Sequence, residues 1–169
     1  WSSDVCSSDL IISLMSSTFT FFRAVLPLYR NRLLSTAGSL RNGGRFNPQG
    51  EFGALYIAES PVVCEAELER KGIVPKKYHA GKLKVILKKI LDLTDKKVVR
   101  SLKIKLDEIM ADDHAMAQAL GRWAHSNEYD AILFPSKTGK GKALCVFEKS
   151  IRRGKNVILL DEWDVDKTK

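Results

Sequence analysis

The sequence has little of what a metal centre or a disulfide framework requires. Its three cysteines are odd in number and share no short spacing, so they predict neither a disulfide framework nor a CxxC motif. Its three histidines, His79, His114 and His125, also lack metal-binding spacings such as HxxxH. We therefore expect no metal cofactor. This cysteine usage favours a reducing cytoplasm as the compartment.

Long apolar runs are also missing. Segments such as 131–134 (AILF) are far shorter than the ~20 apolar residues that a helix needs to cross a bilayer. No basic stretch precedes the apolar residues 10–14, and no small-residue cleavage site follows them, so the sequence predicts no secretory signal. We expect a soluble protein that does not enter a membrane.

The chain of 169 residues has the length of one domain, and a chain of this size buries roughly 70% of its unfolded surface. Its first residues are a poor beginning for a fold. The chain starts with Trp1 and repeats Ser-Ser-Asp within SSDVCSSDL, a string that resembles translated sequencing-adapter sequence. We expect residues 1–14 to be a non-native or disordered leader, with the native start at Met15 or further upstream. Residues 15–169 are expected to form a single domain.

Positive charge exceeds negative charge, because 28 Lys and Arg against 20 Asp and Glu give a formal net charge of +8. This balance fits either a nucleic acid or a small anion such as a dinucleotide as partner. The lysine-rich stretch 76–105 is the main support for a nucleic acid. RNA-binding surfaces usually interleave aromatic with basic residues, whereas this stretch has only Tyr78 among aliphatic residues. We expect a solvated face without direct nucleic-acid binding, and an RNA-directed toxin or binding module is the alternative.

Apolar periodicity predicts strands and helices in alternation. The predicted strands are 18–25, 54–58, 78–93 with a bulge or turn near residues 88–89, 131–134, 143–147 and 157–160. The predicted helices are 61–71, opened by Ser60 and Pro61, then 95–106 and 112–127. In the last helix, apolar residues at spacings of four and three predict a stripe in the core: Met116, Leu120, Trp123 and Ala124.

Residues 27–53 lose this periodicity and gain glycine and proline, which predicts a long irregular loop. Long loops are often functional. Within the string NGGRFNPQG, Arg45 directly follows two glycines, so the backbone can turn sharply and present the guanidinium to a ligand. Arg23, near the end of the first predicted strand, is expected to face the same kind of cleft.

Two common catalytic patterns do not fit the sequence. Ser136, His125 and Asp130 offer the residue types of a hydrolase triad, but no GxSxG motif surrounds the serine. The basic segment 138–142 (TGKGK) lacks the GxxxxGK[ST] pattern of a phosphate-binding loop, and we expect it to form a hairpin turn.

An ordered set of motifs is more specific. FRAV, GGRFNPQG, ALYIAES, EAELE and ILFPS followed by a strand occur in this order between residues 18 and 148, and together they resemble the RES-domain family of bacterial toxins. The resemblance implies an α+β fold related to ADP-ribosyltransferases, in which a split β-sheet with surrounding helices encloses an NAD⁺ cleft. It identifies Arg45, Glu67 and Ser136 as the arginine, glutamate and serine for which the family is named. The family places this glutamate eleven residues after a strand tyrosine, here Tyr56, which itself lies eleven residues after the arginine.

The resemblance implies that NAD⁺ is the substrate and that the bond between nicotinamide and ribose is cleaved. Because the leaving group is already cationic, it needs no general acid, and a carboxylate can stabilise the oxocarbenium-like state. In this interpretation Glu67 binds the ribose hydroxyls and faces the developing cation, while Arg23 and Arg45 hold the pyrophosphate. Tyr56 packs against nicotinamide or the adjoining ribose. Ser136 hydrogen-bonds the ligand or orients the glutamate.

One position departs from the family pattern, since Ala143 stands where family members commonly have asparagine. We expect the asparagine contact to be absent, with Lys140 and Lys142 as the nearby groups able to contact a phosphate. The acceptor of ADP-ribose stays open between water, phosphate and a protein side chain, and the last would make the chain a protein ADP-ribosyltransferase. The resemblance also implies a partner, an Xre-type antitoxin protein that covers the cleft and neutralises the enzyme in the cytoplasm.

Overall fold

The computed structural model describes residues 17–70, 76–152 and 156–168. The leader expected at residues 1–14 and the expected start at Met15 lie outside the described residues. The strands are β1 (Ser17–Val25), β2 (Ala54–Ala58), β3 (Lys77–Leu87), β4 (Ile90–Asp92), β5 (Ala131–Pro135), β6 (Lys142–Phe147) and β7 (Val157–Asp166). The helices are the 3₁₀ helix η1 (Pro27–Arg32) and the α-helices α1 (Ala37–Asn42), α2 (Pro61–Arg70), α3 (Lys96–Ser101), α4 (Leu106–Ile109), α5 (Ala115–Ser126) and α6 (Glu148–Arg152).

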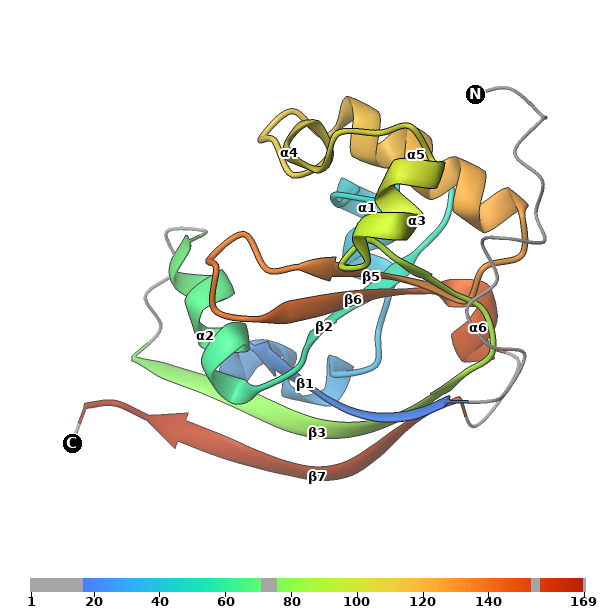
Figure 1. Ribbon diagram of the computed structural model, residues 1–169. Coiled ribbons are helices and arrows are strands. Elements are labelled where there is room, and N and C mark those ends of the chain that lie inside the picture. Colours follow the sequence, from blue (N-terminus) through green and yellow to red (C-terminus); the bar gives the residue numbers. More distant parts are fainter. Residues whose placement is uncertain (1–16, 71–75, 153–155, 169) are drawn as a thin grey trace.

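The strands form one mixed sheet in the order β4-β5-β6-β2-β1-β3-β7. β1 pairs with β3 along its whole length and β2 pairs with β6, but β1 and β2 meet at a single register pair, Phe22 opposite Ala58. The sheet therefore divides at this junction into two halves that diverge from each other (Figure 1). The predicted α+β fold with a split sheet and surrounding helices is confirmed.

Side chains of β2 alternate between two cores, as the period of a strand requires. Ala54 and Tyr56 face a cluster that includes α3 and α5, whereas Leu55 and Ile57 face a second cluster between the two halves of the sheet. Figure 1 shows α3, α4 and α5 on one side of β5, β6 and β2, and the strands β1, β3 and β7 on the other. Both faces of the central strands are thus buried, because one hydrophobic cluster packs on each side of β2.

Three sequence-based expectations need correction. The loop expected at 27–53 contains two short helices, η1 and α1, because Pro27 fixes the first helical turn and Gly43 ends α1 with a φ of +71°. The single helix expected at 95–106 is interrupted, because Lys103 adopts a positive φ of 55° between α3 and α4. Met116 is 43% exposed rather than in the core, since α5 turns this position away from the sheet, although Leu120 and Ala124 are fully buried.

Two further differences are that β7 continues to Asp166 rather than ending at residue 160 and that α6 was not predicted. The other elements lie within a few residues of the predicted ranges. β2 spans the predicted residues, the break between β3 and β4 falls at the expected Lys88 and Lys89, and the TGKGK segment joins β5 to β6 as a turn. In the parts of the chain that the structure describes, no helix has the length and apolar composition needed to cross a membrane.

Candidate functional site

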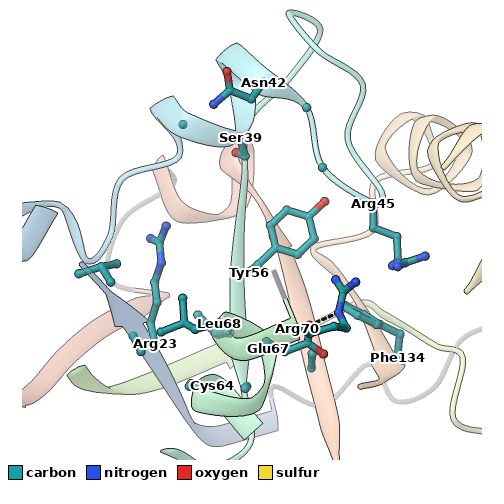
Figure 2. A pocket seen from close by; sticks show the side chains of 18 of the residues that line it. Arg23, Ser39, Asn42, Arg45, Tyr56, Cys64, Glu67, Leu68, Arg70 and Phe134 are labelled. Atoms are coloured by element: carbon teal, nitrogen blue, oxygen red, sulfur yellow. Dashed lines mark hydrogen bonds and ion pairs between the residues drawn. The ribbon is translucent and has the colours of Figure 1, made fainter. Parts of the chain in front are cut away.

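A cavity of about 490 Å³ lies where the two halves of the sheet separate. Its walls come from the ends of β1 and β2, the segment from α1 to Arg45, and one side of α2, with single residues from β5, β6 and the turn before α5. This volume lies within the range of small-molecule sites. Four of the five predicted site residues, Arg23, Arg45, Tyr56 and Glu67, line this cavity (Figure 2). Ser136 does not line the cavity, but its hydroxyl donates a hydrogen bond to Glu67.

The glycines before Arg45 allow its backbone to approach the cavity wall closely. A Cβ on Gly44 would lie 2.6 Å from both the hydroxyl of Tyr56 and Oδ1 of Asn47, so only glycine fits there. Nη1 of Arg45 donates to the carbonyl of Ile109 at 3.1 Å and to that of Ala111 at 2.8 Å. This side chain therefore ties the loop to the segment after α4 while its other nitrogens remain beside the cavity.

The charge of Arg45 is held in a partly desolvated place. Burial lowers the pKa of its guanidinium, and the nearby positive charge of Arg70 lowers this pKa further, while Glu67 and Asp112 oppose the shift. An arginine with a lowered pKa is still protonated at neutral pH. The group therefore offers a fixed positive charge at the cavity.

Tyr56 is fixed at its hydroxyl and exposes its ring. The hydroxyl donates to Oδ1 of Asn47 at 2.8 Å and accepts from the backbone N–H of Phe46 at 3.0 Å. Enclosure by protein, and after it the neighbouring Cys145, raises the pKa of this phenol well above its ordinary value. Tyr56 thus stays neutral, and its ring between Arg23 and Arg45 offers a flat face to a ligand (Figure 2).

Glu67 is the glutamate of α2 that reaches the cavity. Its Oε1 accepts from the hydroxyl of Ser136 at 2.5 Å, and its Oε2 accepts from Nε of Arg70 at 3.2 Å. Glu65 and Glu69 instead form ion pairs with Lys167, away from the cavity. The helical period places Glu65 and Glu69 on one face of α2, where both pair with Lys167, and it turns Glu67 alone toward the cavity wall.

Arg23 lies across the cavity from Arg45 (Figure 2). Its Nη1 donates to the carbonyls of Leu33 at 2.5 Å and Ser35 at 3.1 Å, which anchors the segment between η1 and α1. Desolvation by the surrounding protein lowers the pKa of this guanidinium to about 10, against the raising effect of Cys64. The group is therefore charged at neutral pH and forms the cationic wall on the β1 side.

The position that departs from the family pattern is also in the wall. Ala143 is 7% exposed and lines the cavity, opposite Ala58 of β2 and Phe134 of β5. Its methyl group offers no hydrogen bond there. Lys140 and Lys142 are not among the lining residues, so the two lysines considered as substitutes do not reach this cavity.

Sequence reasoning missed several polar residues in or behind the cavity wall, including Asn47, Arg70 and His114. Asn47 is fully buried and donates to the carbonyls of Ser39 and Phe52 while it accepts from Tyr56; its place in the GGRFNPQG string was the available signal. Arg70 follows Glu67 by one helical turn, a spacing that allows an ion pair. His114 comes from a distant segment and no local pattern pointed to it.

No group of three or more His, Cys, Asp or Glu side chains suited to a metal ion occurs among the described residues. The site is instead a neutral aromatic face and one oriented carboxylate between two cationic walls. Such a site suits an elongated ligand with phosphate groups and a cationic reacting centre.

Comparisons with known proteins agree with this geometry. The RES domain family model matches residues 20–167. The NAD(+) phosphorylases MbcT of Mycobacterium bovis and Mycobacterium tuberculosis are 30% identical over 130 residues, which cover 72% of this chain and 70% of those proteins. The crystal structure of the M. tuberculosis MbcT-MbcA toxin-antitoxin complex matches with a TM-score of 0.78 and 27% identity, over 90% of this chain and 87% of that one. The match covers most of the sequence and both halves of the sheet, and the chain belongs to the RES domain family.

Proposed function

We propose that the protein is a toxin that degrades NAD⁺ by cleaving the bond between nicotinamide and ribose. The observation that carries this proposal is the carboxylate of Glu67, which two donors hold at the cavity wall between Arg45 and Arg23. The similarity to proteins named as NAD(+) phosphorylases supports the substrate.

The chemistry requires little beyond this arrangement. The leaving nicotinamide takes the electron pair of the C–N bond and becomes neutral, so no proton has to be delivered to it. The ribose carbon becomes cationic, and a nearby carboxylate stabilises that charge most where water is excluded. Glu67 is held by Ser136 and Arg70 on its two oxygens, so it can face this charge without reorientation.

The other site residues bind and orient the substrate in this proposal. Arg23 and Arg45 approach the pyrophosphate from opposite walls and bind it through their remaining nitrogens. The ring of Tyr56 packs against nicotinamide or the adjoining ribose. Ser136 orients Glu67 through the hydrogen bond that its hydroxyl donates to the carboxylate.

Phosphate is the acceptor that the similarity to NAD(+) phosphorylases favours, and water is the alternative. The protein partner would be an antitoxin that covers the cavity, since the similar solved structure is a toxin–antitoxin complex. An Xre-type antitoxin and a cytoplasmic location are the finer parts of this proposal. The formal net charge of +8 suits association with an acidic partner.

Product identification tests the proposed activity. The purified protein would be incubated with NAD⁺ in the presence and absence of inorganic phosphate, and the products would be separated by chromatography. We expect nicotinamide in both cases, with ADP-ribose 1″-phosphate when phosphate is present. Unchanged NAD⁺ would contradict the proposal. Labelled protein without free ADP-ribose would instead indicate a protein ADP-ribosyltransferase, and RNA binding with a steep salt dependence but no NAD⁺ loss would indicate a nucleic-acid-directed protein.

A further inference from the structure

Arg70 and His114 both line the cavity, and the proposed binding of NAD⁺ uses neither of them. Nε of Arg70 donates to Glu67, whereas its two Nη atoms donate to no acceptor among the described residues. The side chain is 35% exposed. In Figure 2 its guanidinium points from α2 toward Arg45. The cation is therefore held at one nitrogen and open to a ligand from solvent at the other two.

This part of the cavity carries an excess of positive charge. Arg45 and Arg70 are close enough that the charge of Arg70 disfavours protonation of Arg45. Lys137 and Asp112 lie outside the lining and pair with each other, so together they add no net charge. Among the charged lining residues here, Arg45 and Arg70 stand against the single carboxylate of Glu67. One positive charge is therefore in excess, which favours an anion.

His114 lines the same cavity and brings an imidazole to its wall. Burial is the largest cause that lowers the pKa of its imidazole, and positive charges from three elements follow: Arg45, Lys137 and Arg70. Asp112 alone opposes the shift. The imidazole is therefore neutral near pH 7 and responds to any added charge beside it.

We propose that Arg70 and His114 form a subsite for inorganic phosphate, the acceptor in the cleavage of NAD⁺. The inference rests on the proposed function and deepens it by locating the second substrate. The paired N–H donors of a guanidinium match two phosphate oxygens. Arg23 and Arg45 remain with the pyrophosphate of NAD⁺, so that the cavity binds two separate anions. Glu67, bound to Arg70, lies next to the bound acceptor.

In this arrangement an oxygen of the monohydrogen phosphate dianion attacks the anomeric carbon of the nicotinamide ribose. A C–O bond forms, the C–N bond breaks, and its electron pair moves to the pyridinium nitrogen. The products are neutral nicotinamide and ADP-ribose 1″-phosphate, and no oxidant, reductant or added proton is needed. Water in the same place gives ADP-ribose and releases a proton.

Kinetics with varied phosphate test the subsite. Arg70→Gln removes the charge and is expected to raise the KM for phosphate roughly tenfold to a hundredfold, the effect of one charge-assisted contact. The KM for NAD⁺ should change much less, and the products should shift from ADP-ribose 1″-phosphate toward ADP-ribose. Arg70→Lys keeps the charge and should give an intermediate KM for phosphate. Arg100→Gln, on the exposed side of α3, is the matched control and should behave as the wild type.

Two kinetic results would overturn the subsite. One is an unchanged KM for phosphate in Arg70→Gln. The other is a loss of hydrolysis without phosphate that equals the loss of phosphorolysis, because Arg70 would then act only by positioning Glu67.

Phosphate binding can also be measured without NAD⁺. The pKa of each histidine would be followed by NMR with and without inorganic phosphate. A bound anion should raise the pKa of His114 in the wild type and less in Arg70→Gln, while His79 and His125 serve as internal references. An unchanged pKa of His114 would contradict the subsite. A raised pKa of His114 without cleavage of NAD⁺ would mean that phosphate binds but that the proposed function fails. An unchanged pKa of His114 with cleavage of NAD⁺ would mean that only the subsite fails.

Discussion

At the scale of single residues, the wall of the cavity consists of side chains that hold one another. Tyr56 connects Asn47 to the backbone of Phe46, and Ser136 fixes the carboxylate of Glu67. The position of Arg45 in the cavity wall was predictable from the glycines before it, and those of Tyr56 and Glu67 from the ordered motifs. Their roles in the reaction stay predictions. The role of Asn47 was not predictable, because its buried amide donates to the carbonyls of Ser39 and Phe52, which lie outside its own motif.

Tyr56→Phe tests this mutual support. The change leaves the backbone N–H of Phe46 and the Oδ1 of Asn47 without their partner, so we expect a loss of about 1–3 kcal/mol in the free energy of unfolding. The ring remains, so NAD⁺ cleavage should fall less than in Tyr56→Ala. Urea denaturation and initial rates measure the two effects. Equal stability of Tyr56→Phe and the wild type would show that the hydroxyl contacts do not support the loop.

At the scale of helices and strands, the sequence predicted those elements whose apolar pattern is local. β2 and α2 fall close to their predicted ranges, because Ser60 and Pro61 mark the start of α2 and β2 is a short apolar run, ALYIA, directly after Gly53. The structure of segment 27–53 was harder to predict from the sequence. Its two short helices depend on contacts with distant parts of the chain, such as the hydroxyl of Ser39 on the backbone of Ala54. Short helices have little intrinsic stability of their own.

The contact between α5 and the loop that carries Arg45 gives a prediction at this scale. A Cβ on Gly121 would lie 1.7 Å from the carbonyl oxygen of Phe46, so Gly121→Ala must separate α5 from this loop. We expect a loss of at least about 2 kcal/mol in the free energy of unfolding, as for other overpacked contacts, together with weaker NAD⁺ binding. Calorimetry and NAD⁺ titration measure the two effects.

Gly38→Ala is the matched control for this change. Nothing lies within 4 Å of a Cβ at Gly38, which is in α1, so alanine should raise stability by roughly 0.5–1 kcal/mol through its helix propensity. Similar stabilities for the two alanine variants would show that α5 is not fixed by this close approach.

The pairing of β3 with β7 gives a pH-dependent prediction. Burial lowers the pKa of His79, but hydrogen bonds to Asp164 at 2.8 Å and Glu162 at 3.2 Å outweigh it, so this pKa is raised above 6.5. A raised folded-state pKa stabilises the fold fully below pH 6.5, and this stabilisation is lost as the pH rises through the folded-state pKa.

The difference in unfolding free energy between the wild type and His79→Gln should therefore be larger at pH 6 than at pH 9. Denaturant titrations at the two pH values measure it. A difference that stays constant or grows with pH would contradict the assigned ion pairs with β7.

At the scale of the whole molecule, the site exists because the sheet divides. β1 and β2 are joined by one register pair, and the cavity lies between their diverging ends. No local pattern predicts this arrangement, because the paired strands are far apart in the sequence. β6 pairs with β2 but follows it only after β3, β4 and β5, and β3 pairs with β1 but follows it only after β2 and α2. The split sheet was predicted from the resemblance of the ordered motifs to the RES-domain family and not from apolar periodicity.

The most direct test of the account is a comparison of two substitutions on one helix. Glu67→Gln keeps the size of the side chain but removes the charge at the cavity, whereas Glu69→Gln removes a charge of α2 that pairs with Lys167 outside it. Nicotinamide release would be followed by chromatography, and NAD⁺ binding by calorimetry. We predict that Glu67→Gln still binds NAD⁺ but releases nicotinamide about a hundredfold or more slowly, while Glu69→Gln matches the wild type. Release by Glu67→Gln at the wild-type rate would contradict the account.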